Sequence, residues 1–365
     1  LEVTGLPTAA GLEGRVVAWV RAWAEQHKRK VSLRADRYGN LVIRRVGVTS
    51  TTPIFFTAHL DHPAFAVTKV MDEGKAVQAE FRGGVHDEYF EGTRVAVYPE
   101  DAGRVTGKIV SLDRKRSAKD EQLVTARFAR KTSVKPGDLM TWALPKPTVT
   151  KGTKATGRML RCPACDDLAA VAAAVSAYER LLDKPRGVGD VRLLFTRAEE
   201  VGFVGAIGAT KSGILPKRST LICLENSKSF AESPIGGGPI IRVGDKMSTF
   251  DPELNVKIES LAQQLAKQSK SFNYQRKLMP GGTCEATAFR ALGYLSTCLC
   301  LPLGNYHNMD ESKRRIAPET IALNDYHHLI GLLETIGRNL HATDSGGDLV
   351  RRLDALFERR RALLD

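Results

Sequence analysis

Apolar residues along the chain follow two different rhythms. Between residues 12 and 30 they recur at helical spacing behind Gly11, which predicts an amphipathic first helix. Residues 53–58 and 219–224 are short and largely apolar, as expected for strands buried in a parallel or mixed sheet. Helical segments such as the alanine-rich residues 168–182 alternate with these strands. We therefore expect an α/β core with three layers, α/β/α, around a mixed sheet.

The same patterns predict the remaining elements of this core. Further strands are expected at residues 41–43, 191–196, 272–277 and 294–301. Further helices are expected in a small-residue segment ending near residue 210, at 250–265, at 281–292 and at 317–340, with a charged helical tail after them. Residues 233–244, which contain Gly-Gly-Gly-Pro, are predicted to be a loop. No Lys-Ser or Lys-Thr follows to make a phosphate-binding loop, so a turn or a cleft wall is expected there.

Residues 66–156 differ from the rest of the chain in their pattern of apolar and turn-forming residues. Short β-prone pieces, separated by Gly, Asp and Pro turns, follow one another at residues 67–70, 76–81, 94–98, 105–112, 123–128 and 139–143. We interpret this region as a small β-barrel or sandwich inserted into a larger domain made of residues 1–65 and 157–365. A chain of 365 residues is long enough for such an insertion.

Composition narrows the class of protein. With 42% hydrophobic and 26% charged residues, the chain is typical of globular proteins. No apolar run approaches the roughly 20 residues of a membrane-spanning helix and no export signal is apparent, so we expect a cytoplasmic protein without membrane contact. The net charge of +13 would suit nucleic acid, but the basic groups are scattered, as at Arg114-Lys115-Arg116 and Arg359-Arg360-Arg361, without aromatic platforms. A nucleic-acid partner is therefore not expected.

Six cysteines are too few for a disulfide scaffold in a chain of this length, and reduced thiols are the default for a protein without an export signal. Cys162 and Cys165 have the spacing of half a zinc ribbon, but Cys298 and Cys300 are too closely spaced to form the other half. Neither a structural zinc nor a redox pair is favoured by this spacing.

Acids and histidines stand where predicted strands end or helices begin. They are His59, Asp61, Asp166, Asp167, Glu199, Glu200, Glu225 and His307. Because α/β sheets place their sites at the carboxyl ends of strands, these side chains can converge, and five mixed imidazole and carboxylate ligands can hold two Zn²⁺-like ions if one carboxylate bridges them. Each residue also has a simpler interpretation, such as a solvated acidic pair capping a helix for Glu199 and Glu200.

The order of these motifs resembles one family. His-x-Asp, Asp-Asp at a helix start, Glu-Glu-Val-Gly, an acid after a strand and a late histidine are similar to the co-catalytic zinc aminopeptidases, and most similar to the tetrahedral-aminopeptidase (TET) and glutamyl-aminopeptidase-like family. Further likeness is found at Asp36-Arg37-Tyr38-Gly39-Asn40-Leu41, Lys135-Pro136-Gly137-Asp138, Gly238-Pro239-Ile240-Ile241 and Gly281-Gly282-Thr283. Members carry a β-barrel-like insertion used in oligomer contacts, so the resemblance implies a homo-oligomer in which residues 66–156 also shape access to the site.

The resemblance implies a role for each candidate residue. His59 and Glu225 would bind one metal, Glu200 and His307 the other, and Asp166 would bridge both. Asp61 would orient His59, Glu199 would be the general base, and Asp167 would support the site. The metals would be two divalent ions, zinc above all, with cobalt or manganese as alternatives.

The chemistry implied by the resemblance is removal of N-terminal residues from peptides. Two cations would lower the pKa of a shared water to about 7, and Glu199 would carry a proton from that water to the leaving amine. Contact between a metal and the free α-amine of the substrate would restrict cleavage to the first residue.

The chain also departs from the family at several positions. Most relatives have Asp where this chain has Glu225. They usually have Glu-Gly where His62-Pro63 follow Asp61, which leaves His62 open as an additional ligand or a cleft wall. After Gly-Gly-Thr this chain has Cys284-Glu285 where an Asp is usual, so the preferred N-terminal residue is not inherited. Two other functions stay open: a carboxypeptidase or amide deacylase of the same fold, and an inactive basic binding scaffold, which would bind nucleic acid in a salt-sensitive way.

Overall fold

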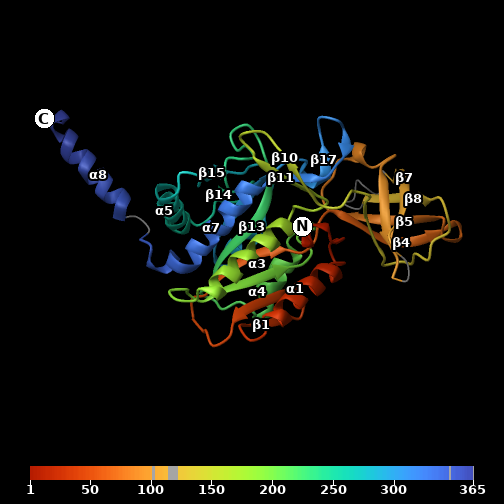
Figure 1. Cartoon of the computed structure of the whole chain (residues 1–365), viewed down its shortest axis with the longest axis horizontal. Helices are drawn as coiled ribbons and strands as arrows, with labels where there is room; N and C mark the ends of the chain where they lie inside the picture. The colour runs from red at the N-terminus through yellow and green to blue at the C-terminus, as the bar shows by residue number, and fades with distance from the viewer. Residues whose placement is uncertain (101–102, 114–121, 345–346, 365) are drawn as a thin grey trace.

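A computed structural model describes residues 1–100, 103–113, 122–344 and 347–364 of the chain. A large sheet stands in the middle of the molecule, with helices against it, a barrel at one end and the C-terminal helix α8 (Gly347–Arg360) projecting at the other (Figure 1). The basic group Arg114-Lys115-Arg116 lies outside the described residues.

The large sheet has eight strands and mixed directions. Their order is β1 (Val31–Ala35), β2 (Leu41–Arg45), β12 (Val191–Thr196), β3 (Ile54–His59), β13 (Thr220–Lys228), β16 (Leu295–Leu303), β14 (Ile240–Gly244) and β15 (Gln275–Leu278). The four central strands, from β12 to β16, run parallel. Every residue of β3 is buried, because helices cover both faces of a central strand. The mixed sheet confirms the predicted α/β core.

Side chains of β3 alternate between two hydrophobic clusters, one on each face of the sheet. Ile54 and Phe56 pack in the cluster that contains buried residues of α1 (Gly14–Gln26), α3 (Leu168–Asp183), α5 (Pro252–Gln268) and α7 (Leu323–Asn339). Phe55 points to the other face and packs with α4 (Val204–Ser212) and α6 (Glu285–Ala291). The centre of the molecule therefore has three layers, with the sheet packed between two layers of helices.

The β-prone region forms a closed six-stranded barrel. Its strands, in spatial order, are β4 (Ala64–Met71), β5 (Ala76–Arg82), β8 (Gln122–Phe128), β7 (Val105–Asp113), β6 (Arg94–Tyr98) and β9 (Leu139–Trp142). The predicted barrel-like insertion is thus confirmed as a feature of the fold. After the barrel, β10 (Thr148–Lys151) pairs with β11 (Arg158–Cys162), and β11 pairs with β19 (Glu319–Ala322). The domain boundaries at residues 65 and 157 stay a prediction.

Three predicted elements near the site are wrong in extent. Residues 319–322 are strand β19, and the closing helix begins at Leu323, because Pro318 disfavours helix before it and the β-branched Thr320 and Ile321 suit pairing with β11. The predicted loop at 233–244 ends in strand β14. The strand expected to stop before Glu225 continues to Lys228, because β16 pairs with it along its whole length.

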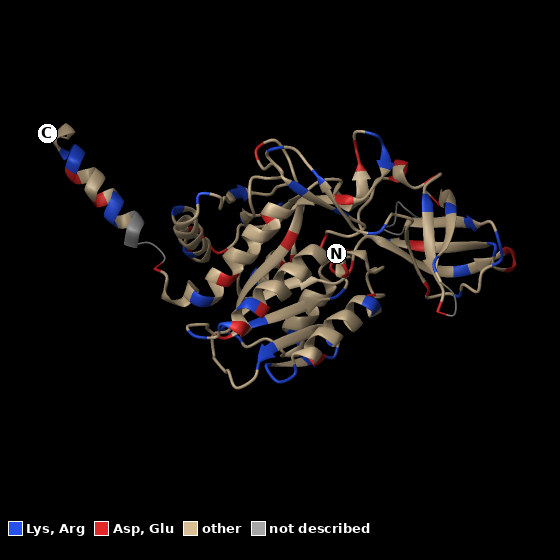
Figure 2. Ribbon diagram, viewed as in Figure 1, with Lys and Arg blue, Asp and Glu red and all other residues tan. Residues whose placement is uncertain are grey.

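Charge is spread over the whole molecule. Lys and Arg lie on strands, helices and the barrel, and in α8 they alternate with acids (Figure 2). The short strands β17 (Met309–Asp310) and β18 (Arg315–Ile316) form a separate hairpin after the late histidine. Among the described residues, no helix combines the length and apolar character needed to cross a lipid bilayer.

Candidate metal centre

Three parallel strands carry candidate residues to one edge of the large sheet. β3 lies between β12 and β13 and ends at His59, which pairs in register with Thr196 at the end of β12. Glu199 and Glu200 follow in the turn after β12, and Glu225 lies in the late part of β13. The carboxyl ends of parallel strands therefore bring an imidazole and three carboxylates together.

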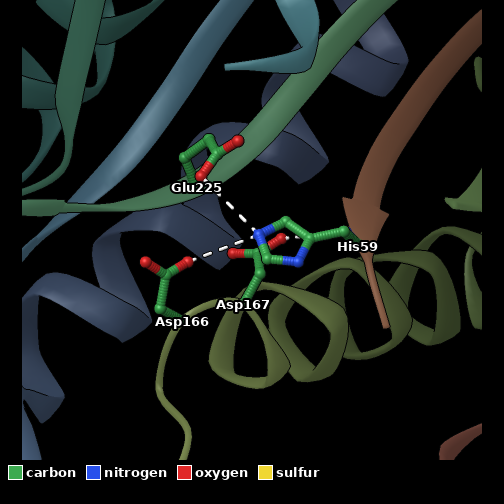
Figure 3. A group of neighbouring side chains, drawn as sticks. All are labelled: His59, Asp166, Asp167 and Glu225. Carbon is green, nitrogen blue, oxygen red and sulfur yellow. Dashed lines mark hydrogen bonds and ion pairs between the residues drawn. The ribbon is translucent and has the colours of Figure 1, made fainter. Parts of the chain in front are cut away.

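The first group of side chains gathers around His59, with Asp166, Asp167 and Glu225 (Figure 3). His59 Nε2 lies 3.4 Å from Asp166 Oδ1 and 4.0 Å from Glu225 Oε2. The Nδ1 atom of the same ring lies 3.2 Å from the Asp61 carbonyl oxygen. With Nδ1 engaged by the backbone, Nε2 is the nitrogen that faces the carboxylates.

A second group consists of Asp166, Glu200 and His307. His307 Nε2 lies 3.4 Å from Glu200 Oε2 and 3.7 Å from Asp166 Oδ2, while its Nδ1 lies 2.6 Å from the carbonyl oxygen of Gly84. Gly84 follows β5, so a loop of the barrel orients this histidine. Asp166 belongs to both groups and presents a different carboxylate oxygen to each histidine.

Asp61 contacts both the end of β3, which carries His59, and the turn that carries Glu199 and Glu200. Its Oδ1 accepts a hydrogen bond from the Glu199 backbone N–H (3.0 Å) and its Oδ2 accepts one from Glu200 (3.1 Å). Oδ1 also lies 3.5 Å from His59 Nδ1. Burial raises the pKa of Asp61, but its contacts with His59 and these two N–H groups outweigh burial and lower it. Asp61 is therefore a fixed anion next to the site.

The two consecutive aspartates, joined by a cis peptide bond, have different surroundings. Asp167 is fully buried, its Oδ2 accepts from the His59 backbone N–H (3.1 Å), and its Oδ1 accepts from Asn226 Nδ2 (2.9 Å). Asp166 Oδ1 is buried and has no hydrogen-bond partner among the described residues. Of the two, Asp166 has the oxygen that still lacks a partner.

Glu319 and Asn226 are residues that the sequence did not single out. Glu319 Oε2 accepts hydrogen bonds from the backbone N–H groups of Cys165 (2.7 Å) and Asp166 (2.9 Å), and its Oε1 accepts from His307 N–H (2.9 Å). One carboxylate thus fixes the loop of Asp166 and the loop of His307. The sequence predicts a helix at residue 319. In the structure this residue lies in β19 opposite Cys162, and that pairing brings its carboxylate to the Asp166 and His307 loops.

His62 lies beside the site and is held by hydrogen bonds at both ring nitrogens. Its Nδ1 is hydrogen-bonded to the carbonyl oxygen of Asp166, and its Nε2 lies 2.9 Å from Asn308 Oδ1. Both ring nitrogens are therefore engaged, and His62 is absent from the groups of metal-capable side chains found among the described residues. Of the two roles left open by the sequence, that of an additional ligand has no support from this geometry.

Crowded acids dominate the electrostatics of the site. Burial raises the pKa of Glu199, Glu200 and Glu225 well above that of an ordinary glutamate, and neighbouring carboxylates add to the effect. Burial lowers the pKa of His59, but the Glu199 charge and contacts with Asp166 and Asp61 outweigh it and raise the pKa well above its ordinary value. The site therefore holds more negative charge than its own histidines neutralise.

These residues fit divalent cations. Imidazole nitrogens and carboxylate oxygens are ligands that zinc, cobalt and manganese accept, and each histidine presents Nε2 while a backbone carbonyl engages Nδ1. Asp166 Oδ1 and Glu200 Oε1 are buried without a hydrogen-bond partner in the described part of the chain. Bound cations would supply partners for both oxygens and the missing positive charge.

Behind the site lies another buried acid, Glu285, at the start of α6. Its side chain is hydrogen-bonded to Thr196, and its Oε1 has no hydrogen-bond partner among the described residues. Burial raises its pKa to about 7, against the attraction of His59. The sequence marked this residue only as a departure from the family pattern.

A cavity of about 300 Å³ opens beside Glu225. It is lined on one side by β13 and the segment after it, including Lys228 and Phe230, and on the other by Met279 and the Gly281-Gly282 turn. Arg242 and Tyr306 complete its wall. The cavity is therefore mixed in character, with apolar and aromatic walls and two basic residues.

Comparisons with known proteins identify the family and agree with this fold. The sequence model of the M42 glutamyl aminopeptidase family matches residues 39–320. No curated protein sequence matches the chain significantly. Among solved structures, the TET1 peptidase of Pyrococcus horikoshii, described as assembling into a tetrahedron or a large octahedral shell, matches with a TM-score of 0.73 at 23% identity over 93% of this chain and 98% of its own.

Two other archaeal structures match to a similar degree. A TET aminopeptidase from a marine sediment thaumarchaeon has a TM-score of 0.74 at 21% identity, covering 93% of this chain and 95% of its own. An aminopeptidase from Desulfurococcus kamchatkensis has a TM-score of 0.72 at 21% identity, with 93% of each chain covered. At these identities the structural likeness concerns the fold.

Proposed function

Because the chain belongs to the M42 glutamyl aminopeptidase family and is a metallo-aminopeptidase, we propose that it removes N-terminal residues from peptides at a centre of two divalent metal ions. His59 and Glu225 would hold one ion, Glu200 and His307 the other, and Asp166 both. The single observation that carries this proposal is the position of Asp166, whose Oδ1 lies 3.4 Å from His59 Nε2 and whose Oδ2 lies 3.7 Å from His307 Nε2.

Other contacts support this division of roles. Asp167 uses both carboxylate oxygens for hydrogen bonds, which favours Asp166 as the shared ligand. Asp61 holds the His59 ring and the Glu199–Glu200 backbone, which suits a residue that orients ligands without binding metal itself. The side chain of Glu225 reaches to 4.0 Å from His59 Nε2.

We assign the general base to Glu199. When bound, divalent ions polarise a carbonyl group and make a water molecule more acidic. Glu199 is buried, its Oε2 lies 3.9 Å from His59 Nε2, and its backbone is fixed by Asp61. Its raised pKa, caused mainly by burial, suits a group that accepts a proton from the attacking water on a carboxylate oxygen and then gives it to the nitrogen of the leaving amine.

The substrate would enter beside Glu225. The cavity next to this residue has the size and the apolar and aromatic walls of a pocket for the first side chain of a peptide. Assembly into a homo-oligomer is also proposed, by analogy with the shells described for the Pyrococcus TET1 peptidase. Light scattering on the purified full chain would test assembly, and a monomer at all concentrations would contradict it.

The test of the proposed centre uses two adjacent residues. The full chain, loaded with Zn²⁺, Co²⁺ or Mn²⁺, is assayed on amino-acid amides with free and N-acetylated amines, and metal content is measured by elemental analysis. We expect two ions per chain and cleavage of the free amines only. Glu199→Gln should retain both ions and lose turnover about 10²–10⁴-fold, whereas the matched Glu200→Gln should also lose metal.

Each part of this proposal can fail separately. Full activity of Glu199→Gln would rule out the assigned base, and one ion per chain would rule out the dinuclear centre. Cleavage of acetylated substrates that carry a free carboxylate would favour the carboxypeptidase or deacylase alternative over an aminopeptidase.

A further inference from the structure

Cys162 and Cys165 face each other next to the candidate metal centre. Cys162 ends β11 and Cys165 immediately precedes Asp166, and their Sγ atoms lie 3.0 Å apart. Both side chains are fully buried. At this distance the two thiols are in hydrogen-bonding contact, and a disulfide bond, at about 2.05 Å, would bring the sulfurs about 1 Å closer.

The pair does not form part of a metal site. Structural zinc needs four ligands, and the groups of three or more metal-capable side chains in the described residues contain neither cysteine. The nearby carboxylate of Glu319 is already engaged with three backbone N–H groups. A chemical bond between the two sulfurs is thus the reaction that this arrangement favours.

The loop that joins the two cysteines also positions Asp166. The Cys165 and Asp166 N–H groups share one oxygen of Glu319, and the Cys165 carbonyl oxygen accepts a hydrogen bond from Asn226 Nδ2 (2.9 Å). The Asp166 carbonyl oxygen is hydrogen-bonded to His62. A displacement of Cys165 would therefore be transmitted directly to the carboxylate that belongs to both groups of ligands.

We propose that Cys162 and Cys165 form a reversible disulfide whose formation weakens metal binding at the adjacent centre. The effect on metal rests on the proposed function; the bond itself does not. The oxidant is a low-molecular-weight disulfide. One cysteine sulfur attacks it and releases the first small thiol, and the second cysteine then attacks the mixed disulfide and releases the other. The pair gives up two electrons and two protons, and the oxidant becomes two thiols.

A cavity reaches the loop that joins the two cysteines, although neither cysteine lines it. Pro163 and Ala164, between the two cysteines, line a cavity of about 260 Å³ bounded by the N-terminal segment and the barrel. Joining the sulfurs requires them to approach by about 1 Å, from 3.0 Å to the bond length, and Cys165 moves with its neighbour Asp166. Disturbing the groups that orient metal ligands typically weakens metal affinity about 10–100-fold, and we expect an effect in that range.

The experiment follows the bond and the metal independently. The full chain is incubated with oxidised glutathione under native conditions, remaining thiols are alkylated in denaturant, and peptides are mapped by mass spectrometry. Because burial raises the pKa of Cys165, incubation should extend over hours at neutral pH. We expect a Cys162–Cys165 linkage that dithiothreitol removes, and zinc affinity, measured against a chromogenic chelator, about 10–100-fold weaker in the oxidised chain.

Matched variants make the result specific. In Cys162→Ser, or Cys162→Ala if the serine variant does not fold, zinc affinity should no longer respond to oxidised glutathione. Cys298→Ser, which changes a buried cysteine elsewhere in the core, should respond like the natural chain. Absence of the 162–165 linkage, or a linkage with unchanged zinc affinity, overturns the proposal. If the reduced chain binds no metal, the proposed function is overturned instead. Mass spectrometry still shows in that case whether the Cys162–Cys165 linkage forms.

Discussion

Buried side chains of the barrel interact mainly with one another, whereas two carboxylate oxygens of the metal centre, Asp166 Oδ1 and Glu200 Oε1, have no hydrogen-bond partner among the described residues. In the barrel, Phe65 packs edge-on against Phe81 at 4.9 Å and Trp142 at 4.8 Å between ring centroids. Such pairs need no further ligand, since their stabilisation comes from burial and aromatic contact. Even in the barrel, the buried indole N–H of Trp142 has no hydrogen-bond partner among the described residues.

At the metal centre, burial destabilises the charged side chains instead of stabilising them. Glu199, Glu200 and Glu225 lie near one another and are removed from water, so burial and then repulsion between neighbouring carboxylates raise their pKa values and favour protonation. The polypeptide alone leaves this repulsion uncompensated. The barrel is therefore stabilised by its own packing, whereas the acids of the metal centre need positive charge that bound cations would supply.

The two regions meet at His307. The barrel loop supplies the Gly84 carbonyl oxygen that engages Nδ1 of this histidine. The comparison predicts that substitutions in the barrel core lower the free energy of unfolding without changing metal affinity, provided that the Gly84 loop keeps its position.

The largest expected effect comes from opening the barrel core. Phe65→Ala removes a fully buried ring that contacts Phe81, Phe90 and Trp142, and should lower the free energy of unfolding by about 3–5 kcal/mol. Urea unfolding followed by tryptophan fluorescence measures this loss. Phe56→Ala, the matched change in strand β3, should lose as much and also weaken metal binding, because β3 ends at His59. Equal metal affinity in the two variants would break the comparison.

The next effect concerns the acid behind the centre. Glu285 has a pKa of about 7 when folded, against an ordinary 4.5, so the folded chain holds a proton that the unfolded chain has released. Its contribution to stability is therefore lost as pH rises from 4.5 through 7. A difference of about 2.5 pKa units corresponds to on the order of 3 kcal/mol at about 1.4 kcal/mol per unit.

Glu285→Gln cannot ionise, so it should remove this dependence. We expect the metal-free variant to be more stable than the natural chain at pH 8 and nearly equal to it at pH 5, measured by urea unfolding. A gain of the same size at both pH values would mean that packing, and not charge, is responsible. Glu285→Asp keeps the charge and serves as the control.

Local patterns were sufficient to predict the fold class and the barrel. The buried strand at 53–58 and the alanine-rich helix at 168–182 have sharp periodicity, and the family match agrees with the motif order around Glu199 and Glu200. The structure also brings His59, Asp166, Glu200, Glu225 and His307 into overlapping groups of metal-capable side chains, although their roles as ligands stay a proposal.

Residues whose importance depends on pairing between distant strands were not predictable. Glu319 follows Pro318 in a segment that reads as the start of a helix, and only its pairing with Cys162 turns it toward the Asp166 loop. Asn226 follows Glu225 in a polar stretch and Glu285 follows the Gly-Gly-Thr motif, but neither position in the sequence indicates which groups it meets in the fold. A single sequence records which groups are polar, but the register that brings them together is a property of the folded chain.

Removing metal should affect the two regions unequally. Ligand at about 100 times its dissociation constant stabilises a folded protein by about 2.7 kcal/mol, so a chelator should lower the melting temperature of the zinc-loaded chain. Hydrogen exchange measured by mass spectrometry should then increase at residues 59–62, 165–167 and 305–308. The barrel strands β5 and β8 should keep their protection, and a uniform increase over both regions would contradict the separation.

The smallest expected effect tests how the centre is held when no ligand is altered. In Glu319→Gln only one side-chain oxygen remains, so either the Cys165 and Asp166 N–H groups or the His307 N–H loses its acceptor. We expect a loss of about 2 kcal/mol in unfolding free energy, with zinc affinity falling about 10–100-fold. Glu311→Gln changes an exposed acid paired with Lys228 and should do neither. Glu319 accepts from the loops of both Asp166 and His307, and the barrel loop also orients His307 through the Gly84 carbonyl oxygen. Unchanged zinc affinity in Glu319→Gln would therefore mean that the barrel and the sheet edge fix the ligands without it.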